Sequence, residues 1–176
     1  MNCSRRLKRG IIGGMVSILL IALDQYTKFL AVKYLRNQPN IVFWKDVFEL
    51  QYLENRGAAF GIMQGQKFFF VIFTSIAMIG IVWFFIKKIP EAPKYRFLDI
   101  ICVMLFAGGI GNLIDRVRLN YVIDFFYFSL IDFPIFNVAD IYVTVAAFAM
   151  IILGMFYYKD EDYDLIFPSK KEKGKK

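Results

Sequence analysis

Four stretches of this sequence are almost wholly apolar, and each has about the length that a helix needs to cross a lipid bilayer. An α-helix rises about 1.5 Å per residue, so roughly 20 residues span the ~30 Å hydrocarbon core. The stretches cover residues 11–35, 68–86, 97–113 (extending through 114–118) and 136–158. Hydrophobic residues make up 58% of the 176 residues, more than one small soluble domain can readily bury. The pattern therefore predicts a mainly α integral membrane protein with four transmembrane helices.

Positive charges are unevenly placed around these stretches, and their placement predicts the orientation of the chain. Residues 1–9 carry four Lys or Arg, the connection 87–96 carries four, and the tail from residue 159 carries six. The other side carries seven in all, five over residues 33–67 and two over residues 115–137. Because Lys and Arg favour the cytoplasmic side of a membrane, we expect both termini to be cytoplasmic and the segments 36–67 and 115–137 to face outward.

The first outward segment and the C-terminal tail have patterns of their own. Apolar and polar residues alternate over 48–52, which is typical of a half-buried strand, and residues 55–61 carry turn-forming types. We therefore expect a small extracytoplasmic β-sheet. The tail is charged and poor in apolar residues, which predicts disorder. The expected organisation is one membrane-embedded domain over 1–158 and a charged cytoplasmic tail over 159–176.

The composition excludes several kinds of site. The sequence has no histidine, which removes Ser-His-Asp and Cys-His triads and histidine-ligated metals. Its two cysteines, Cys3 and Cys102, lie at the start of the chain and inside an apolar stretch, so neither a disulfide framework nor a zinc site is expected. The net charge of +7 comes from residues at the ends of apolar stretches, which argues against nucleic acid as a partner. Any hydrolytic chemistry must use carboxylates, lysine or tyrosine.

Ionisable groups inside the apolar stretches are costly and each needs a reason. Asp24 lies deep in the first stretch, and Lys28 follows four residues later on the same helix face, where the two side chains can pair. One interpretation is a structural ion pair that holds the helix against its neighbours. The other is a functional role for the carboxylate, and the two residues alone do not decide between them.

The third stretch ends in a polar block that contains Asn112, Asp115 and Arg116. Gly108, Gly109 and Gly111 precede and overlap this block, and their lack of side chains allows a neighbouring helix or a substrate backbone to approach. Helical rise places Asn112 and Asp115 at the outer boundary of the hydrocarbon. Taken alone, the block is better explained as helix-packing glycines with an interfacial Asp115–Arg116 ion pair than as a functional site.

Two further carboxylates follow at the same expected height. Asp124 lies among apolar and aromatic residues, where loss of hydration would raise its pKa, unless it points to water from a surface loop. Asn137 and Asp140 begin the fourth stretch and share a face, although acids in a first helical turn also suit the helix dipole. Two carboxylates brought close together split their titrations, so one can accept a proton from water while the other donates one. That is the arrangement of an aspartic peptidase, and it needs neither histidine nor metal.

At these residues the sequence resembles the bacterial lipoprotein signal peptidase family, also called signal peptidase II. The resemblance covers nearly the whole chain, from residue 24 to about residue 144. Its motifs are the blocks 23–28, 55–61, 111–116, 122–125 and 136–140, in the order typical of the family. No single block is specific, but five together on this topology are.

The resemblance implies a four-helix inner-membrane enzyme with an outward β-cradle, both termini cytoplasmic and an active site near the outer face. Its substrate would be a diacylglyceryl-modified prolipoprotein, cut just before the lipidated cysteine, with membrane lipid around it. By motif, Asp124 and Asp140 are the catalytic pair, with no metal and no cofactor. The residues implied to line or support the site are Asp24, Asn55, Gly57, Asn112, Asp115, Arg116, Asn137 and Ala139. The enzyme is expected to be a monomer and to be inhibited by globomycin-type peptides.

Alternatives remain open from the residues themselves. Asp115 is also acidic and also lies in a family block, but a neighbouring Arg116 would keep it ionised, so we rank Asp124 above it as the catalytic acid. Intramembrane acids could instead mark an ion path of a transporter, which predicts acids spread through the depth of the bilayer. Here all the acids except Asp24 and Asp99 are expected at one level, which argues against that interpretation. Asp and Asn oxygens could also hold Mg²⁺ or Ca²⁺ in a metal-dependent hydrolase. A serine-lysine peptidase is ranked last, because Ser17, Ser75 and Ser129 have no evident basic partner.

Overall fold

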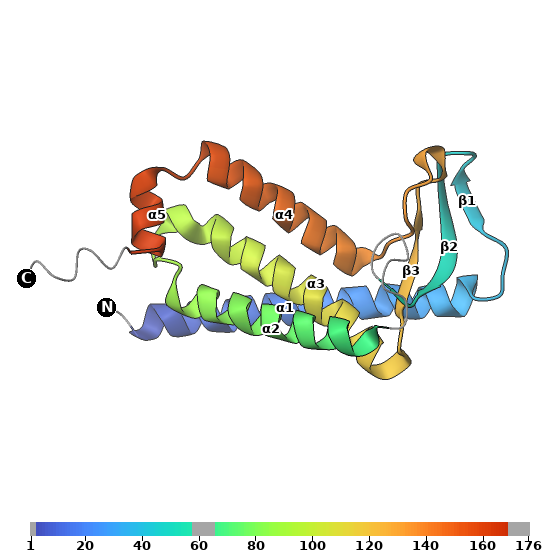
Figure 1. The fold of residues 1–176 in the computed structure, drawn as a ribbon, viewed down its shortest axis with the longest axis horizontal. Helices are drawn as coiled ribbons and strands as arrows, with labels where there is room; N and C mark the ends of the chain where they lie inside the picture. Colours follow the sequence, from blue (N-terminus) through green and yellow to red (C-terminus); the bar gives the residue numbers. More distant parts are fainter. Residues whose placement is uncertain (1–2, 58–65, 169–176) are drawn as a thin grey trace, which may run out of the picture.

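The structure is a computed structural model that describes residues 3–57 and 66–168. Within these residues, long helices lie side by side with a small sheet across one end (Figure 1). The helices are α1 (Cys3–Leu35), α2 (Lys67–Lys87), α3 (Arg96–Leu119), α4 (Val138–Phe156) and the short α5 (Asp160–Ile166). The strands are β1 (Ile41–Trp44), β2 (Phe48–Asn55) and β3 (Val122–Tyr127), and the 3-10 turns are η2 (Pro93–Tyr95) and η3 (Ser129–Ile131).

The long helices α1 to α4 coincide with the four apolar stretches of the sequence. Among the described residues, three helical segments are long and apolar enough to cross a membrane: α2, η2 with α3, and α4. Many large apolar side chains on them face outward, such as Phe73 on α2 and Met155 on α4. A helix that is apolar on its outer face is suited to hydrocarbon rather than water. The mainly helical fold is thus confirmed with three candidate membrane helices, and α1 is not among the three.

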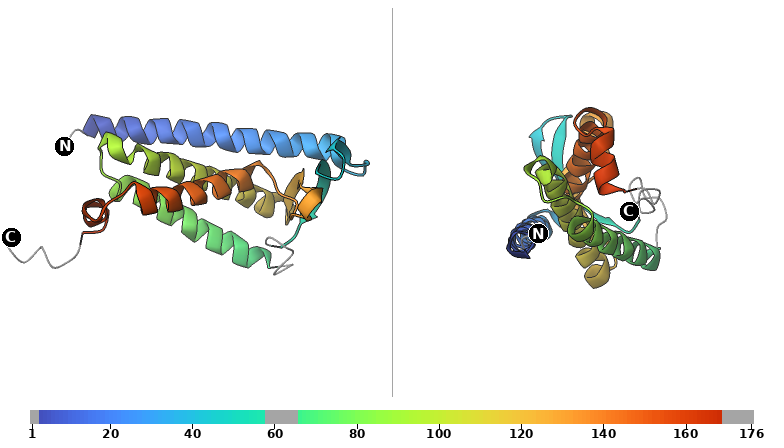
Figure 2. Two further views of the ribbon diagram at one scale, coloured as in Figure 1. Left: turned by 90° about the horizontal axis from the view of Figure 1, so that it is seen from above. Right: turned by 90° about the vertical axis from the view of Figure 1, so that its left-hand side faces the viewer.

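Helix α3 is the centre of the bundle, because it packs against α1, α2 and α4 (Figure 2). Its glycines explain the close approach of the neighbouring helices. A Cβ atom at Gly108 would lie 2.6 Å from the backbone oxygen of Ala139 in α4. A Cβ atom at Gly111 would lie 2.5 Å from a carboxylate oxygen of Asp24 in α1. The glycine block therefore sets how near α1 and α4 come to α3 at the sheet end of the bundle.

The predicted sheet is confirmed and is antiparallel in the order β1-β2-β3. The alternating segment 48–52 lies within β2, whose partner β3 arrives from the end of α3. Side chains of β3 and the last turns of α1 form an apolar cluster that includes Leu35 and Phe125. This packing fixes the sheet over the helix ends, with Leu53 opposite Asp124 and Asn55 at the end of the ladder. Part of the turn predicted over 55–61, residues 58–61, lies outside the described residues.

The tail differs from the disordered segment that the sequence predicts. Residues 160–166 form helix α5, in which Asp162 and Ile166 are buried. The Asp162 carboxylate accepts hydrogen bonds from the Tyr95 hydroxyl at 2.7 Å and from the Lys159 backbone at 2.9 Å, and it pairs with Lys94. The tail folds here because the connection before α3 supplies these partners, which composition alone does not reveal. Residues 169–176 lie outside the described residues, and the division at 158/159 remains a prediction.

The close approach at Gly108 predicts a cost for any added side chain. Gly108→Ala would push a methyl group against backbone of α4, and overpacking of this kind costs about 1–3 kcal/mol. We expect its thermal midpoint in detergent to fall by several degrees. Gly80→Ala on α2 is the matched control, since a Cβ there meets nothing within 4 Å. An unchanged midpoint for Gly108→Ala would contradict the packing described here.

Candidate active site

A cavity of about 570 Å³ is lined by β3 and the first turns of α4. Figure 1 shows that these elements meet at the sheet end of the bundle. Its polar lining comes from every element that meets there. The polar residues that line it are Asn55 of β2, Asn112 and Arg116 of α3, Asp124 of β3, and Asp140 and Thr144 of α4. Sequence spacing predicts that Asn112, Asp124 and Asp140 reach one level, and the structure brings these three to one cavity.

Asp124 is buried in β3, with 1% of its surface exposed, and so does not point to water from a surface loop. Asn55 donates a hydrogen bond to one carboxylate oxygen at 2.9 Å, and Asn137 donates to the other at 2.6 Å. Burial, together with the charge of Asp140, raises the pKa of Asp124 to about 7, although both amide hydrogen bonds act in the opposite direction. Asp124 therefore retains a proton over much of the physiological range.

Asp140 occupies the first turn of α4 and takes part in its N-terminal cap. The Asn137 side chain accepts a hydrogen bond from the Asp140 backbone at 3.0 Å, and an Asp140 oxygen accepts from the Asn137 backbone at 3.1 Å. This reciprocal pair is a capping box. The other Asp140 oxygen accepts from the Asn112 amide at 2.8 Å and lines the cavity. Asp140 thus caps its helix, as dipole preference predicts, and also presents an oxygen to the site.

Two asparagine side chains link the carboxylates. The Asn137 amide nitrogen lies 2.6 Å from an Asp124 oxygen and 3.1 Å from the Asn112 amide oxygen. The Asn112 amide nitrogen in turn donates to Asp140. Each of the two amides both donates and accepts hydrogen bonds in this series. A rotation of either side chain would therefore break two hydrogen bonds at once. The relative position of Asp124 and Asp140 is therefore fixed from two directions.

Below the cavity, the Lys28 ammonium group is almost fully buried and has three acidic or amide partners. It lies 2.9 Å from oxygens of Asp24, Asp115 and the Asn112 side chain. The i, i+4 pair with Asp24 is the one that spacing predicts. An ammonium group has three N–H donors, so this set satisfies all of them in a place without water access. Lys28 thereby joins α1 to α3 directly beneath the two asparagines.

The ion pair expected between Asp115 and Arg116 is wrong. Asp115 instead binds Lys28 and accepts a hydrogen bond from the Ile123 backbone at 3.2 Å. Arg116 donates to the Gly57 carbonyl at 3.2 Å and lies over the Phe70 ring. Consecutive residues on a helix point in different directions, so adjacency in sequence does not place their side chains together. Asp115 is buried outside the cavity, whereas Arg116 lines it.

The remaining predicted residues also have definite contacts. Asp24 accepts a hydrogen bond from the Ala139 backbone at 2.9 Å, which ties α1 to α4. The Gly57 backbone donates to the Asn55 side chain at 3.0 Å and so helps orient that amide toward Asp124. Sequence reasoning missed Gln25, which donates to Asp24, to Asp115 and to the Gly111 carbonyl. The sequence feature that could have identified Gln25 is its position: it is an uncharged polar residue inside an apolar stretch, directly after Asp24.

The charges of the site do not balance. Four carboxylates, from Asp24, Asp115, Asp124 and Asp140, meet two cations, from Lys28 and Arg116. A buried group of four acids and two cations is strongly disfavoured when every acid is ionised. The site therefore favours keeping at least one proton on a carboxylate, and Asp124, whose pKa burial raises to about 7, is an acid that can hold it.

Two serines proposed as alternatives have other partners. Ser17 donates to the Gly13 carbonyl at 2.9 Å and Ser75 to the Val71 carbonyl at 2.7 Å, each within its own helix. Such back-bonding is the usual way for a serine to satisfy its hydroxyl inside a membrane helix. In the described part of the chain, no group of three or more His, Cys, Asp or Glu side chains has a geometry suited to a metal ion. Neither Ser17 nor Ser75 lines the cavity that holds Asp124 and Asp140.

Comparison with known proteins identifies relatives over most of the chain. The family model described as Signal peptidase (SPase) II matches residues 16–156. The lipoprotein signal peptidases of Streptococcus pyogenes serotype M5 (strain Manfredo) and serotype M18 (strain MGAS8232) are each 42% identical over 146 residues. Those residues cover 83% of this chain and 92% of each relative. These findings confirm the resemblance inferred from the sequence motifs.

Solved structures agree with the sequence relatives. A bacterial membrane enzyme determined by the in meso method at 2.3 Å resolution matches with a TM-score of 0.76 and 31% identity, over 85% of this chain and 92% of that one. A second, determined by the same method at 1.9 Å, matches with a TM-score of 0.73 and 32% identity, over 84% and 94%. With the family model covering residues 16–156 and relatives matched over nearly their full length, this chain belongs to the signal peptidase II family.

Proposed function

We propose that this protein is a membrane aspartic endopeptidase that removes the signal peptide from diacylglyceryl-modified prolipoproteins by cutting just before the lipidated cysteine. The observation that carries this proposal is the pair of buried carboxylates, Asp124 and Asp140, on one cavity and joined through two asparagines. Membership of the signal peptidase II family supports a peptidase, and the names of the relatives support the lipoprotein substrate.

The proposed membrane arrangement adds α1 as a fourth span beside the three candidate helices. Helix α1 has 33 residues, runs along α3, and exposes apolar side chains such as Ile18 and Leu19. The basic start of α1, the 87–96 connection and α5 lie at the end opposite the sheet (Figure 1). The positive-inside rule then supports cytoplasmic termini in the inner membrane, with the sheet and the cavity at the outer face. We propose that a monomer suffices, since every polar group of the site comes from one chain.

In the proposed mechanism a water molecule lies between the two carboxylates. Asp140 is ionised, its charge stabilised by the N-terminus of α4 and the Asn112 amide. It accepts a proton from the water as the water oxygen attacks the scissile carbonyl carbon. Asp124 donates its proton to the carbonyl oxygen, and a tetrahedral diol forms. The C–N bond then breaks, the amine leaves with a proton from Asp140, and Asp124 recovers its own proton from the diol.

The apolar side of the cavity suits a lipidated substrate. Phe128, Ile131 and Phe133 follow β3, and Ile141 and Val145 face them from α4. Diacylglyceryl chains held against these side chains would stay in contact with the bilayer, while the peptide bond before the cysteine reaches the carboxylates. Globomycin-type peptides are expected to compete with substrate for the same cavity.

We also propose that Lys28 is a positioning residue. It does not line the cavity, but its ammonium group binds the Asn112 side-chain oxygen, which leaves the Asn112 nitrogen directed at Asp140. An amide can present its oxygen and its nitrogen to only one arrangement of partners. The cation therefore fixes which end of Asn112 faces the reacting carboxylate.

The first prediction from the proposed function concerns the two carboxylates. Asp124→Asn and Asp140→Asn should each lower cleavage of a lipidated prolipoprotein by at least about 100-fold, because each loses its proton-transfer role. Asp132→Asn is the matched control, since Asp132 is exposed on the same segment and does not line the cavity. Thermal unfolding in detergent checks that the variants fold. Robust cleavage by Asp124→Asn, with none by Asp115→Asn, would transfer the catalytic role to Asp115.

The second prediction concerns pH. The pKa of Asp124 is raised to about 7, so its proton is present below that pH and is lost as the pH rises through it. Loss of the proton removes the general acid, and kcat/KM should fall about tenfold per pH unit above the apparent pKa. The measurement is kcat/KM from about pH 6 to about pH 9 in one membrane mimic, with the fold monitored throughout. A rate that climbs steadily across this range would contradict the assignment.

The third prediction concerns Lys28. Lys28→Met removes the cation that offsets Asp24 and Asp115, and an uncompensated buried charge typically costs about 3–5 kcal/mol. The thermal midpoint should fall well below that of wild type. Lys33→Met, at an exposed position on the same helix, should leave the midpoint close to wild type. Equal midpoints for the two variants would show that the buried cluster contributes little to folding.

A further inference from the structure

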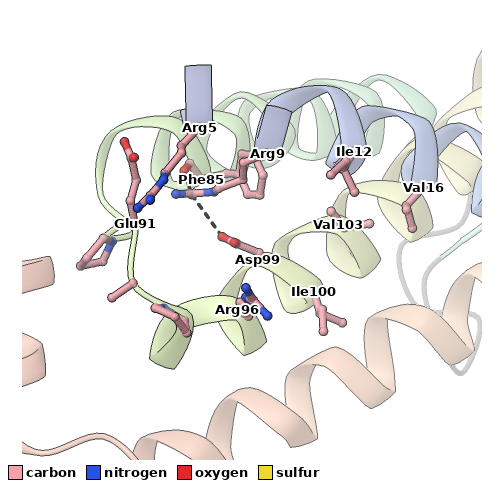
Figure 3. Close-up of a pocket in the computed structure, with 14 residues that line it drawn as sticks. Arg5, Arg9, Ile12, Val16, Phe85, Glu91, Arg96, Asp99, Ile100 and Val103 are labelled. Atoms are coloured by element: carbon pink, nitrogen blue, oxygen red, sulfur yellow. Dashed lines mark hydrogen bonds and ion pairs between the residues drawn. The ribbon is translucent and has the colours of Figure 1, made fainter. Parts of the chain in front are cut away.

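A second cavity, of about 720 Å³, lies at the opposite end of the bundle from the proposed active site (Figure 3). It is enclosed by the start of α1, the connection between α2 and α3, and the first turns of α3. None of its lining residues takes part in the carboxylate site. Its volume falls within the ~300–1,000 Å³ of known small-molecule sites.

The charged groups of this cavity differ in whether the protein already satisfies them. Arg9 donates to the carbonyls of Ile89 and Phe85 and lies 3.1 Å from Asp99 in an ion pair. Glu91, the other acid of the lining, is paired with Arg6. Each carboxylate of the lining is therefore paired with an arginine, although Arg9 Nε and one Asp99 oxygen are buried without a hydrogen bond.

Arg5 and Arg96 are the two arginines of this cavity whose charge is not paired with a described carboxylate. Both line the cavity, and neither makes a hydrogen bond or an ion pair with any residue in the described ranges. They come from different helices, α1 and α3, and Figure 3 shows them on opposite sides of the cavity, with Asp99 drawn between them. Two guanidinium groups in this position favour an anion with several oxygens, such as a phosphate diester.

The rest of the cavity is apolar and runs along the helices. Ile12 and Val16 of α1 face Ile100 and Val103 of α3, and Arg96 lies beside Ile100 at the edge of this apolar part (Figure 3). A ligand that fits must therefore carry a negative head at the helix ends and a hydrocarbon tail parallel to them. Soluble phosphates lack the tail, and fatty acids lack the diester, whereas an anionic phospholipid has both.

We propose that this cavity binds one anionic phospholipid from the surrounding leaflet. Its phosphate lies between Arg5 and Arg96, and one acyl chain lies between α1 and α3. The proposal rests on the membrane arrangement proposed above, in which this end of the bundle meets the cytoplasmic headgroups, where basic pockets between membrane helices attract anionic lipid. Bound lipid would hold α1 to α3 at this end, as the Lys28 cluster does at the other.

The test compares lipid binding by native mass spectrometry of the full chain in detergent. Wild type should bind one phosphatidylglycerol in preference to phosphatidylcholine. Arg5→Gln/Arg96→Gln should weaken phosphatidylglycerol binding by about fivefold for each arginine removed. The control, Lys87→Gln/Lys88→Gln, removes two charges at the same end outside the cavity and should retain wild-type affinity. Neither arginine makes a hydrogen bond or an ion pair with a described residue, so the thermal midpoint without lipid should be unchanged.

Several results would overturn the proposal. Equal loss in both double variants would mean that diffuse surface charge attracts the lipid, and no loss in the arginine variant would mean that the cavity is not the site. Displacement of phosphatidylglycerol by millimolar inorganic phosphate would assign the site to a free anion. The readout is binding rather than cleavage, so an inactive Asp124→Asn protein that still binds lipid would separate this proposal from the proposed function.

Discussion

The buried ammonium group of Lys28 is the interaction on which the rest of the site depends. An unpaired cation in that position is unstable, so Asp24, Asp115 and Asn112 must converge on it. That convergence brings α1 against α3, which is possible only because Gly111 has no side chain where Asp24 lies. The charge of Lys28 thus explains why α1 contacts α3, why residue 111 is a glycine, and how the Asn112 amide is oriented.

From Asn112 the constraint continues to the reacting groups. Asn112 and Asn137 contact both Asp124 and Asp140, and Asn137 is also the N-cap of α4. The hydrogen bonds of Asn137 therefore both cap α4 and position the carboxylates of Asp124 and Asp140. Because the site has more acids than cations, the proton that Asp124 keeps is a property of the whole cluster rather than of one side chain. In the proposed mechanism, the stability of the helix start and the protonation of the catalytic pair cannot be changed independently.

Much of this arrangement could be predicted from the sequence, and the failures have physical causes. Helical rise placed Asn112 and Asp140 at one height, because depth along a helix depends only on residue number. Contacts around the helix axis depend on the neighbours, and for that reason the Asp115–Arg116 pair was wrong. Helix α5 was missed because Asp162 finds its partners, Lys94 and Tyr95, far away in the sequence. Orientation of Asn55 toward Asp124 required the strand register, which turn chemistry does not provide.

The distance between the two cavities follows from the length of α3. Arg96 lies at one cavity and Asn112 at the other, and sixteen residues of helix separate them by about 24 Å, close to the thickness of the hydrocarbon core. Each polar cavity can then lie at a membrane surface while the residues between them stay in lipid. In the proposed membrane arrangement, shortening α3 by a turn would draw the carboxylates into hydrocarbon, where water and a peptide bond are costly to bring. The span of this helix is thus part of the proposed catalytic design.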